Sequence, residues 1–366
     1  MLRIIIGRTG SGKSEKCITE FNAYIQKNRS VDTASYLFVP EQYNMLTERR
    51  LLDFQVCENF PVKGLMGHEV LNFKRFVHRI LSIYGLSKTK QLTECGKIML
   101  LTAAVSNKAN DMLFYKSLRD KNGEITKVLS LIDEFGKYGI TYSQLSNINT
   151  DDMYLNRKLH DIALLYEEYE SLKKDKYSDE NDSFENMLMH VEKNNFFKNK
   201  SVWIDSFTGF TAQENKLIKL MLRQCKSVTI TLCTDYSGEP AFACIDRTLE
   251  SLKGLAAENS IETEIINLSA DRASNKQKYN NLSIFNLEQN ISCNRITKSY
   301  DYSNIFLAEC EGVFDEVIYC AEQIKFLHNE KNIEYGKIAV ALRDIKASSD
   351  ILWSLCAKKL SSLYDQ

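Results

Sequence analysis

The sequence is short of several features that would place it in a specialised class of protein. Its 366 residues include three prolines and 15 glycines, too few for a proline-rich linker, a collagen-like repeat or a glycine-rich disordered chain. Lysines and arginines number 47 and aspartates and glutamates 48, so the formal net charge is −1. A protein with so little bulk charge can bind nucleic acid only through a local basic patch.

Long apolar runs and metal-type cysteine clusters are also missing. No apolar run reaches the roughly 18–20 residues that a membrane-spanning helix needs, and the N-terminus carries no signal-peptide pattern. We therefore expect a cytoplasmic protein without membrane contact. The 10 cysteines are scattered, with no CxxC pair and no cysteine–histidine cluster of zinc-ligand spacing. Structural thiols are favoured over a metal site.

The strongest local signal is a phosphate loop near the N-terminus. Residues 2–6 are typical of a buried strand, and a helical pattern runs from Ser14 to about Asn28. In such loops backbone N–H groups surround the phosphates, the lysine reaches the β- and γ-phosphates, and the hydroxyl ligates Mg²⁺. The sequence therefore predicts a site for ATP and Mg²⁺. The segment fits GxxxxGK[ST] at every fixed position and consists of Gly7, Arg8, Thr9, Gly10, Ser11, Gly12, Lys13 and Ser14.

The other half of such a site is an aspartate at the end of a second strand, where it holds Mg²⁺. The apolar strand at 201–204 ends at Asp205, and a second candidate strand ends at Asp235. A turn or helix-cap role is the alternative for either carboxylate, but the strand context favours Asp205. Ser206 follows it in place of the glutamate that would orient an attacking water. We therefore predict ATP binding and no catalytic residue.

The spacing of apolar residues predicts an α/β fold with a divided sheet domain. Strands are expected at 2–6, 35–39, 202–205 and 228–233 in one parallel sheet, and βα alternation continues with a helix at 243–258 and a strand at 261–268. We predict a P-loop domain at 1–89 and 196–270, a mainly helical insertion at 90–195, a linker region at 271–300 and the start of a second α/β domain at 301–366. In this last segment we expect strands at 305–307 and 338–342 around a helix at 313–327.

Residues 70–93 combine five lysines and arginines with aromatic residues and no carboxylate. Basic groups can contact phosphates, and aromatic rings can stack on unpaired bases. From the pattern alone we favour an amphipathic helix, with Phe76 and Ile80 in the core and the basic residues in solvent. Gln42 follows the strand at 35–39 and either contacts DNA or caps the next helix, which starts near Asn44.

The element order and three motifs resemble superfamily 1 helicases. Residues 205–214 resemble the second helicase motif, with Ser206 in place of its glutamate. Residues 70–81 are similar to a segment that contacts single-stranded DNA, and residues 338–343 to a motif with an arginine at the domain interface. The resemblance implies DNA contact by Phe73, Lys74 and Arg75, and nucleotide contact by Arg343, for which a structural salt bridge is the alternative.

More closely, the chain resembles the N-terminal part of the AddB-type subunits of bacterial AddAB helicase–nucleases. The stretches Gly7–Ser14, Phe38–Gln42 and Val202–Glu214 carry this resemblance. It implies an ATP- and DNA-binding component of a helicase/exonuclease that processes double-strand breaks for recombinational repair, with an AddA-type motor subunit as partner. It also implies a longer protein whose C-terminal nuclease domain and iron–sulfur cluster lie outside this sequence.

Two alternatives to this function remain open from the residues themselves. A self-sufficient superfamily 1 helicase is disfavoured by Ser206 and by the later helicase motifs, which the sequence does not contain. A P-loop nucleotide or small-molecule kinase is disfavoured by the long helical segment at 90–195, which a compact kinase does not need.

Overall fold

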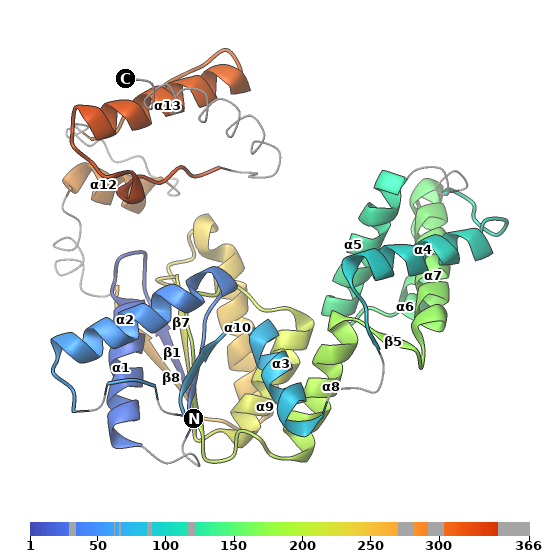
Figure 1. Ribbon diagram of the computed structural model, residues 1–366, viewed down its shortest axis with the longest axis horizontal. Helices are drawn as coiled ribbons and strands as arrows, with labels where there is room; N and C mark the ends of the chain where they lie inside the picture. Colours follow the sequence, from blue (N-terminus) through green and yellow to red (C-terminus); the bar gives the residue numbers. More distant parts are fainter. Residues whose placement is uncertain are drawn as a thin grey trace. The chain divides into compact units, whose positions relative to one another are not determined.

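A computed structural model describes most of the chain (Figure 1). The described residues are 1–28, 34–61, 63–65, 67–85, 90–115, 122–269, 281–291 and 304–342. The chain forms two compact units, of which unit 1 contains Met1–Asn280 and Glu288–Ile296, and unit 2 contains Asn281–Leu287 and Thr297–Gln366. No helix in the described part is both long and apolar enough to cross a lipid bilayer.

Unit 1 is built on a six-stranded sheet whose pairings are all parallel. Its spatial order is β3-β2-β6-β7-β1-β8. This confirms that the four predicted strands share one parallel sheet, and β3 is an edge strand beyond those predicted. The strands are β1 (Leu2–Ile6), β2 (Tyr36–Phe38), β3 (Glu69–Leu71), β6 (Ser201–Ile204), β7 (Ser227–Leu232) and β8 (Thr263–Asn267).

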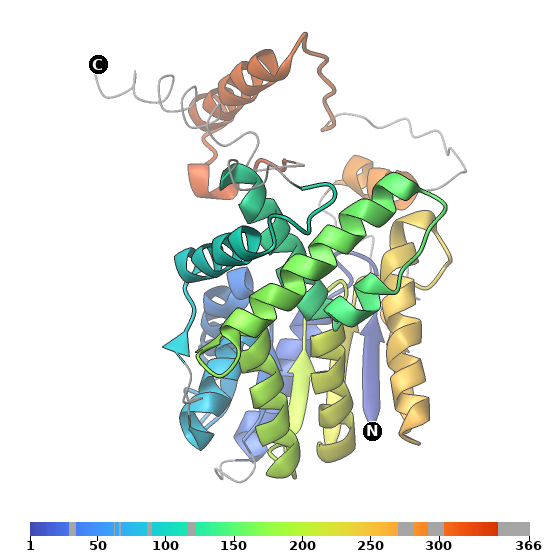
Figure 2. The same ribbon diagram turned by 90° about the vertical axis from the view of Figure 1, so that its right-hand side faces the viewer.

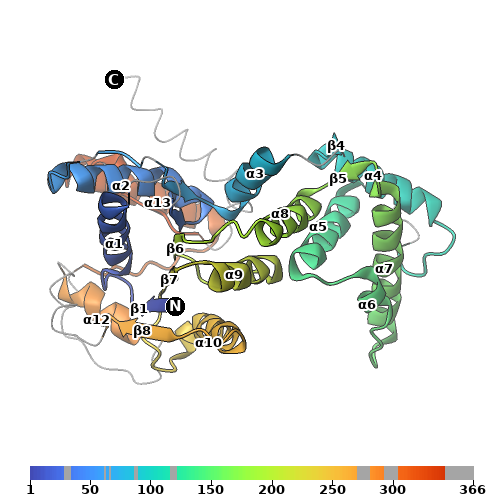
Figure 3. The same ribbon diagram turned by 90° about the horizontal axis from the view of Figure 1, so that it is seen from below.

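Helices cover both faces of the sheet, so nearly all residues of its inner strands are buried. One face packs on α1 (Lys13–Lys27) and α2 (Asn44–Cys57), and its core includes Phe21, Leu37 and Trp203. The other face packs on α3 (Phe73–Tyr84), α8 (Glu180–Lys193), α9 (Ala212–Gln224) and α10 (Ala243–Glu258). Figure 3 shows α1 on one side of the strands and α9 and α10 on the other.

The segment between β3 and β6 is mainly helical in its described residues, as its periodicity predicts (Figure 2, teal to green). Its helices bury a core of their own, which includes Leu101, Val128, Ile132 and Tyr169. The helix α8 instead packs its apolar side chains into the core beneath the sheet. The remaining elements are β4 (Lys90–Gln91), α4 (Glu94–Asn107), α5 (Asn122–Tyr138), α6 (Tyr142–Ser146), α7 (Met153–Lys173) and β5 (Tyr177–Ser178).

In unit 2 the predicted second α/β domain is represented only by its helix, α13 (Val313–Asn329). The segments 305–307 and 338–342, predicted to be strands, carry no strand in the described part of the chain. A strand needs hydrogen-bonding partners, and Phe306 and Leu307 are instead 85% and 99% exposed. The predicted linker at 271–300 contains the helix α12 (Leu282–Asn290), and most of its other residues lie outside the described ranges.

Candidate nucleotide-binding site

The phosphate loop, Gly7–Ser14, joins the end of β1 to the start of α1 at the carboxyl edge of the sheet. Gly10 and Gly12 have φ angles of 76° and 85°, a left-handed conformation that other residues rarely adopt. A Cβ atom on Gly7 would lie 2.3 Å from the Ser11 hydroxyl oxygen. Glycine is therefore required at these three positions for the loop to curl tightly.

The first turn of α1 presents backbone N–H groups toward the space enclosed by the loop. Gly12 is the N-cap residue, so no side chain caps this helix end. The hydroxyl of Ser11 is buried and has no hydrogen-bond partner in the structure. Free helix amides and an unpartnered hydroxyl are groups that a phosphate anion can satisfy.

Lys13 places its ammonium group within the same loop. Its Nζ donates a hydrogen bond to the carbonyl oxygen of Arg8 at 2.8 Å. Burial lowers the pKa of Lys13 below its ordinary value, although Cys233 and the carboxylate of Asp205 act in the opposite direction. A bound phosphate would offset this burial, because it supplies an anion to a cation that has been taken out of water.

The structure brings Ser14 and Asp205 together although 191 residues separate them in the sequence. The Ser14 hydroxyl donates to Asp205 Oδ1 at 3.1 Å, and the Asp205 side chain is nearly buried. Thr231 and Ser206 also donate hydroxyl hydrogen bonds to this carboxylate. Of the two candidate aspartates, Asp205 is therefore the one beside the phosphate loop hydroxyl, since Asp235 pairs with Arg8 instead.

The oxygen donors of Ser14 and Asp205 fit a magnesium ion that arrives with a nucleotide. Magnesium prefers oxygen ligands and is usually held by one or two protein groups together with phosphates and water. Among the described residues, no group of three or more histidines, cysteines or carboxylates is placed to hold a metal by itself. A metal at this position would thus depend on the phosphates of a bound nucleotide.

No glutamate takes the place that Ser206 occupies after Asp205. Ser206 has a φ of 67° and turns its hydroxyl back onto Asp205. Glu214 accepts the backbone N–H of Thr211 at 2.8 Å in a capping box at the start of α9, so it serves the helix end. Glu41 lies exposed in a short 3₁₀ turn, Glu41–Tyr43. Neither carboxylate is seen beside Ser14.

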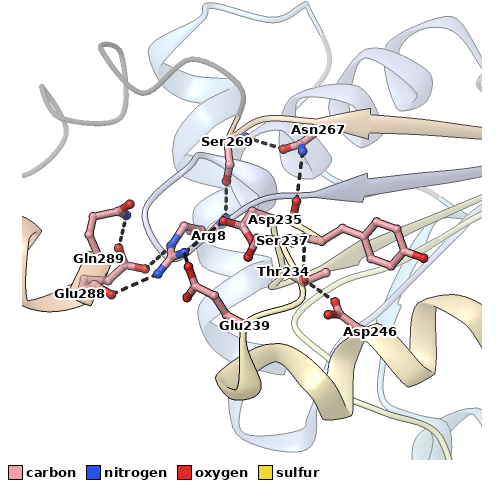
Figure 4. A network of polar contacts seen from close by, with 11 residues as sticks. Arg8, Thr234, Asp235, Ser237, Glu239, Asp246, Asn267, Ser269, Glu288 and Gln289 are labelled. Carbon is pink, nitrogen blue, oxygen red and sulfur yellow. Dashed lines mark hydrogen bonds and ion pairs between the residues drawn. The ribbon is translucent and has the colours of Figure 1, made fainter. Parts of the chain in front are cut away.

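Arg8 is held by three carboxylates (Figure 4). Its Nη1 donates to Asp235 and to Glu239 at 3.0 Å each, and its Nε donates to Glu288 at 3.0 Å. Its Nη2 donates to the carbonyl oxygen of Glu288 at 3.1 Å, and the guanidinium lies 4.9 Å from the centre of the Phe242 ring. The side chain is only 9% exposed. Burial lowers the pKa of Arg8. The hydrogen bonds to Glu239, Glu288 and Asp235 outweigh this effect and raise the pKa above its ordinary value.

The backbone of Arg8 is fixed as firmly as its side chain. Its N–H donates to the hydroxyl of Ser269 at 2.6 Å, just after β8. Its carbonyl oxygen accepts hydrogen bonds from Lys13 Nζ and from the backbone N–H of Ser11. Arg8 therefore links the phosphate loop to segments that follow β7 and β8 in the sheet.

Three of the residues predicted to contact DNA, Phe73, Lys74 and Arg75, lie in the first turn of α3. Lys74 is exposed and pairs with Glu180 at 2.7 Å. Arg75 is also exposed, and its guanidinium has no ion pair within the described ranges. Phe73 is 5% exposed and stacks on Phe38 at 5.1 Å between ring centres. Its ring belongs to the core and also lines a cavity beside α3, so its contact with DNA stays a prediction.

Gln42 lies exposed in the 3₁₀ turn before α2. The N-cap residue of α2 is Tyr43, and no side chain caps that helix end, so the cap role considered for Gln42 is not seen. Arg343 lies outside the described residues.

A cavity of about 250 Å³ adjoins α3. Phe73, Val77 and Phe184 contribute apolar lining, and Lys74 and Gln213 contribute polar groups. Gln213 is 5% exposed, and no hydrogen bond of its side chain is seen in the described part of the chain. The cavity therefore combines an apolar wall with an amide and a cation.

Three residues near the phosphate loop are not predictable as parts of the site. Cys233 follows β7 and places its sulfur 3.5 Å from the Thr9 hydroxyl. Glu239 and Glu288 pair with Arg8 from more than 200 residues away in the sequence. The sequence signal for Cys233 is its position at the end of the strand predicted at 228–233. No neighbouring residue in the sequence indicates that Glu239 or Glu288 pairs with Arg8.

The family model and the similar proteins point to one protein family. The family model described as "ADDB, N-terminal" matches residues 4–288. The chain is 29% identical over 97% of its length to the B subunit of the ATP-dependent helicase/deoxyribonuclease of Clostridium botulinum, and 27% identical over 96% to that of Clostridium novyi. The corresponding protein of Alkaliphilus metalliredigens is 28% identical over 96% of this chain. The chain spans about 31% of the first two relatives and 30% of the third.

Proposed function

Because the chain belongs to the family of AddB N-terminal domains, we propose that it is the helicase-like part of the B subunit of an ATP-dependent helicase/deoxyribonuclease. In this role it binds ATP with Mg²⁺ and binds DNA, and it hydrolyses little or no ATP by itself. It works as a heterodimer with an AddA-type motor and nuclease subunit in the processing of DNA double-strand breaks for recombination. The relatives are named as one subunit of such an enzyme, which supports a partner subunit here.

The contact between Ser14 and Asp205 is the observation that carries the ATP proposal. A hydroxyl at the start of α1 and a carboxylate at the end of β6 meet at 3.1 Å, where a magnesium ion bound to a nucleotide would sit. Lys13 and the uncapped helix amides lie in the same loop. This arrangement supports a helicase-type P-loop domain at 1–89 and 196–270, with residues 90–195 as its helical insertion.

The exposed first turn of α3 supports DNA binding through Lys74 and Arg75. Both cations lie at the end of β3, on the same edge of the sheet as the phosphate loop. The neighbouring cavity offers the apolar wall and amide group that an unpaired base requires. We keep Gln42 and Phe73 as further DNA contacts, since Phe73 lines this cavity.

The nucleotide proposal is tested by the Lys13→Ala variant. We expect its ATP affinity to fall about 10-fold or more, since a charge-assisted contact of at least ~1.4 kcal/mol is lost. Titration calorimetry with ATP and Mg²⁺ measures this change. Lys16→Ala is the matched control, because Lys16 lies on the same helix and pairs with Glu20 at 3.6 Å. Equal ATP affinity in wild type and Lys13→Ala would refute the proposed ATP site at Gly7–Ser14.

The DNA proposal is tested by the Lys74→Ala and Arg75→Ala variants. Each should weaken binding of single-stranded DNA and lower the slope of log K against log salt by about 0.7, the value for one phosphate contact. Fluorescence anisotropy across a salt series measures both quantities. Arg223→Ala is the control, because Arg223 is exposed at the far end of α9, away from α3. An unchanged slope in both test variants contradicts the proposal.

A further inference from the structure

We propose that Arg8 is a positioning residue of the nucleotide site, which fixes the start of the phosphate loop to the loop after β7 and to Glu288, and does not itself contact phosphate. The inference rests on the proposed ATP site and concerns a residue whose type the phosphate-loop pattern leaves free. It assigns the two cations of the loop, Arg8 and Lys13, to different tasks.

The guanidinium of Arg8 is already committed to other acceptors. It makes four hydrogen bonds, three to carboxylate oxygens and one to a carbonyl oxygen. Arginine forks bind carboxylates strongly because several parallel N–H groups share the charge. The face of the guanidinium is also covered, since the Phe242 ring lies 4.9 Å away. A phosphate oxygen could reach this group only by displacing a carboxylate.

Lys13 is in the opposite situation. Its ammonium donates a hydrogen bond to a neutral acceptor, the Arg8 carbonyl oxygen, and also interacts with the Cys233 side chain, while no carboxylate forms an ion pair with it among the described residues. A neutral hydrogen bond is weaker than a charge-assisted one, so a phosphate oxygen can replace or join it. The Arg8 carbonyl oxygen is thus the atom that holds Lys13 in the loop before a nucleotide binds.

The hydrogen-bond acceptors of Arg8 include residues that follow β7 and β8, the strands on either side of β1. Asp235 and Glu239 lie in the loop between β7 and α10, and the backbone N–H of Arg8 is held by Ser269 after β8. β7 and β8 are the two strands that pair with β1. Arg8 therefore fixes the end of β1 to the ends of both neighbours, which presets the loop amides for an anion.

The charges around Arg8 make the two roles distinguishable by the sign of an effect. Three carboxylates surround one guanidinium, so the cluster carries excess negative charge beside the site of an anionic ligand. If Arg8 bound phosphate, neutralising a carboxylate would free it and reduce repulsion, and ATP would bind more tightly. If Arg8 positions the loop, the same change loosens the loop and ATP binds less tightly.

The experiment measures ATP and ADP affinity of the full chain by calorimetry for wild type, Glu239→Gln and Arg8→Lys. We expect Glu239→Gln to weaken binding of both nucleotides, and Arg8→Lys to weaken both by about 10-fold, the loss of one charge-assisted contact. The losses should be equal for ATP and ADP, because positioning does not depend on the γ-phosphate. Glu258→Gln is the control, since Glu258 pairs with Lys219 at the other end of α10.

Tighter ATP binding by Glu239→Gln overturns the inference. So does a loss in Arg8→Lys that affects ATP and spares ADP, because that pattern indicates contact with the γ-phosphate. Thermal melting followed by circular dichroism checks folding, and Glu239→Gln decides the question if Arg8→Lys does not fold. Failure of the wild-type protein to bind ATP would instead refute the proposed function, which keeps the two tests separate.

Discussion

The purified chain is expected to bind ATP with Mg²⁺ without turning it over, even with single-stranded DNA present. Hydrolysis needs a carboxylate that orients the attacking water and a cation that stabilises the transferring phosphoryl group. Ser206 occupies the position after Asp205, and Glu214 is engaged in the cap of α9. Arg8 is held by three carboxylates, so the loop offers no free arginine. An arginine finger is worth about 10³–10⁵ in rate, and its absence leaves hydrolysis near background.

Phosphate release measured with and without single-stranded DNA checks this expectation, and Lys13→Ala supplies the background rate. Turnover of about one per second, an ordinary enzymatic rate, that disappears in Lys13→Ala would show that a catalytic carboxylate exists elsewhere. Glu41→Gln and Glu214→Gln would then identify it. Loss of turnover in Glu214→Gln without loss of thermal stability would indicate that Glu214 leaves its capping position when nucleotide binds.

Replacement of Lys173 by methionine is expected to lower the free energy of unfolding by about 3–5 kcal/mol, the cost of breaking a buried charge network on one side. Lys173 is 4% exposed. Its ammonium lies 2.8 Å from Glu170, 2.7 Å from Asp179 and 3.1 Å from Asp182. Burial alone would lower the pKa of Lys173, but Asp179 and Glu170 outweigh it and raise this pKa above its ordinary value. Without the lysine, the three carboxylates would repel one another in a poorly solvated site.

Urea unfolding followed by circular dichroism measures the change, and Lys174→Met is the control because the neighbouring lysine is exposed. ATP binding should stay unchanged in folded Lys173→Met, since the cluster joins α7 to the start of α8 and lies outside the phosphate loop. Equal stability of the two variants would show that solvent or rearrangement compensates the carboxylates.

Regular patterns in the sequence are enough to predict the sheet and the tight glycine-containing turn at Gly7–Ser14. The strands at 2–6 and 228–233 are rich in buried β-branched and apolar residues because helices cover both faces of the sheet, and such runs are visible without a structure. The glycine spacing of the phosphate loop reports a backbone conformation directly. The helix at 313–327 is likewise indicated by its periodicity and is seen as α13.

Contacts that depend on how distant segments meet cannot be derived from the sequence. Nothing near Arg8 in the sequence indicates that its partners are Asp235, Glu239 and Glu288. An aromatic residue beside cations is equally compatible with base stacking and with a core, and only the structure shows that Phe73 packs against Phe38 while it also lines a cavity. The strands predicted in unit 2 are not seen in the described residues for a related reason. A strand needs a hydrogen-bonding partner strand, and a local sequence pattern does not show whether one is present.

The place of β1 in the sheet has a consequence for the order of events during synthesis. This strand pairs only with β7 and β8, so Ile4 meets Ile230 and Ile265. The helices α4, α5, α6 and α7 bury a core of their own and can fold while the chain is still growing. The first strand made must therefore wait for the last strands of the sheet, on the order of tens of seconds at the usual ribosomal speed. During that interval β1 is unpaired, and its apolar side chains are a target for chaperones. The proposed ATP site has not yet formed, so ATP cannot stabilise the growing chain.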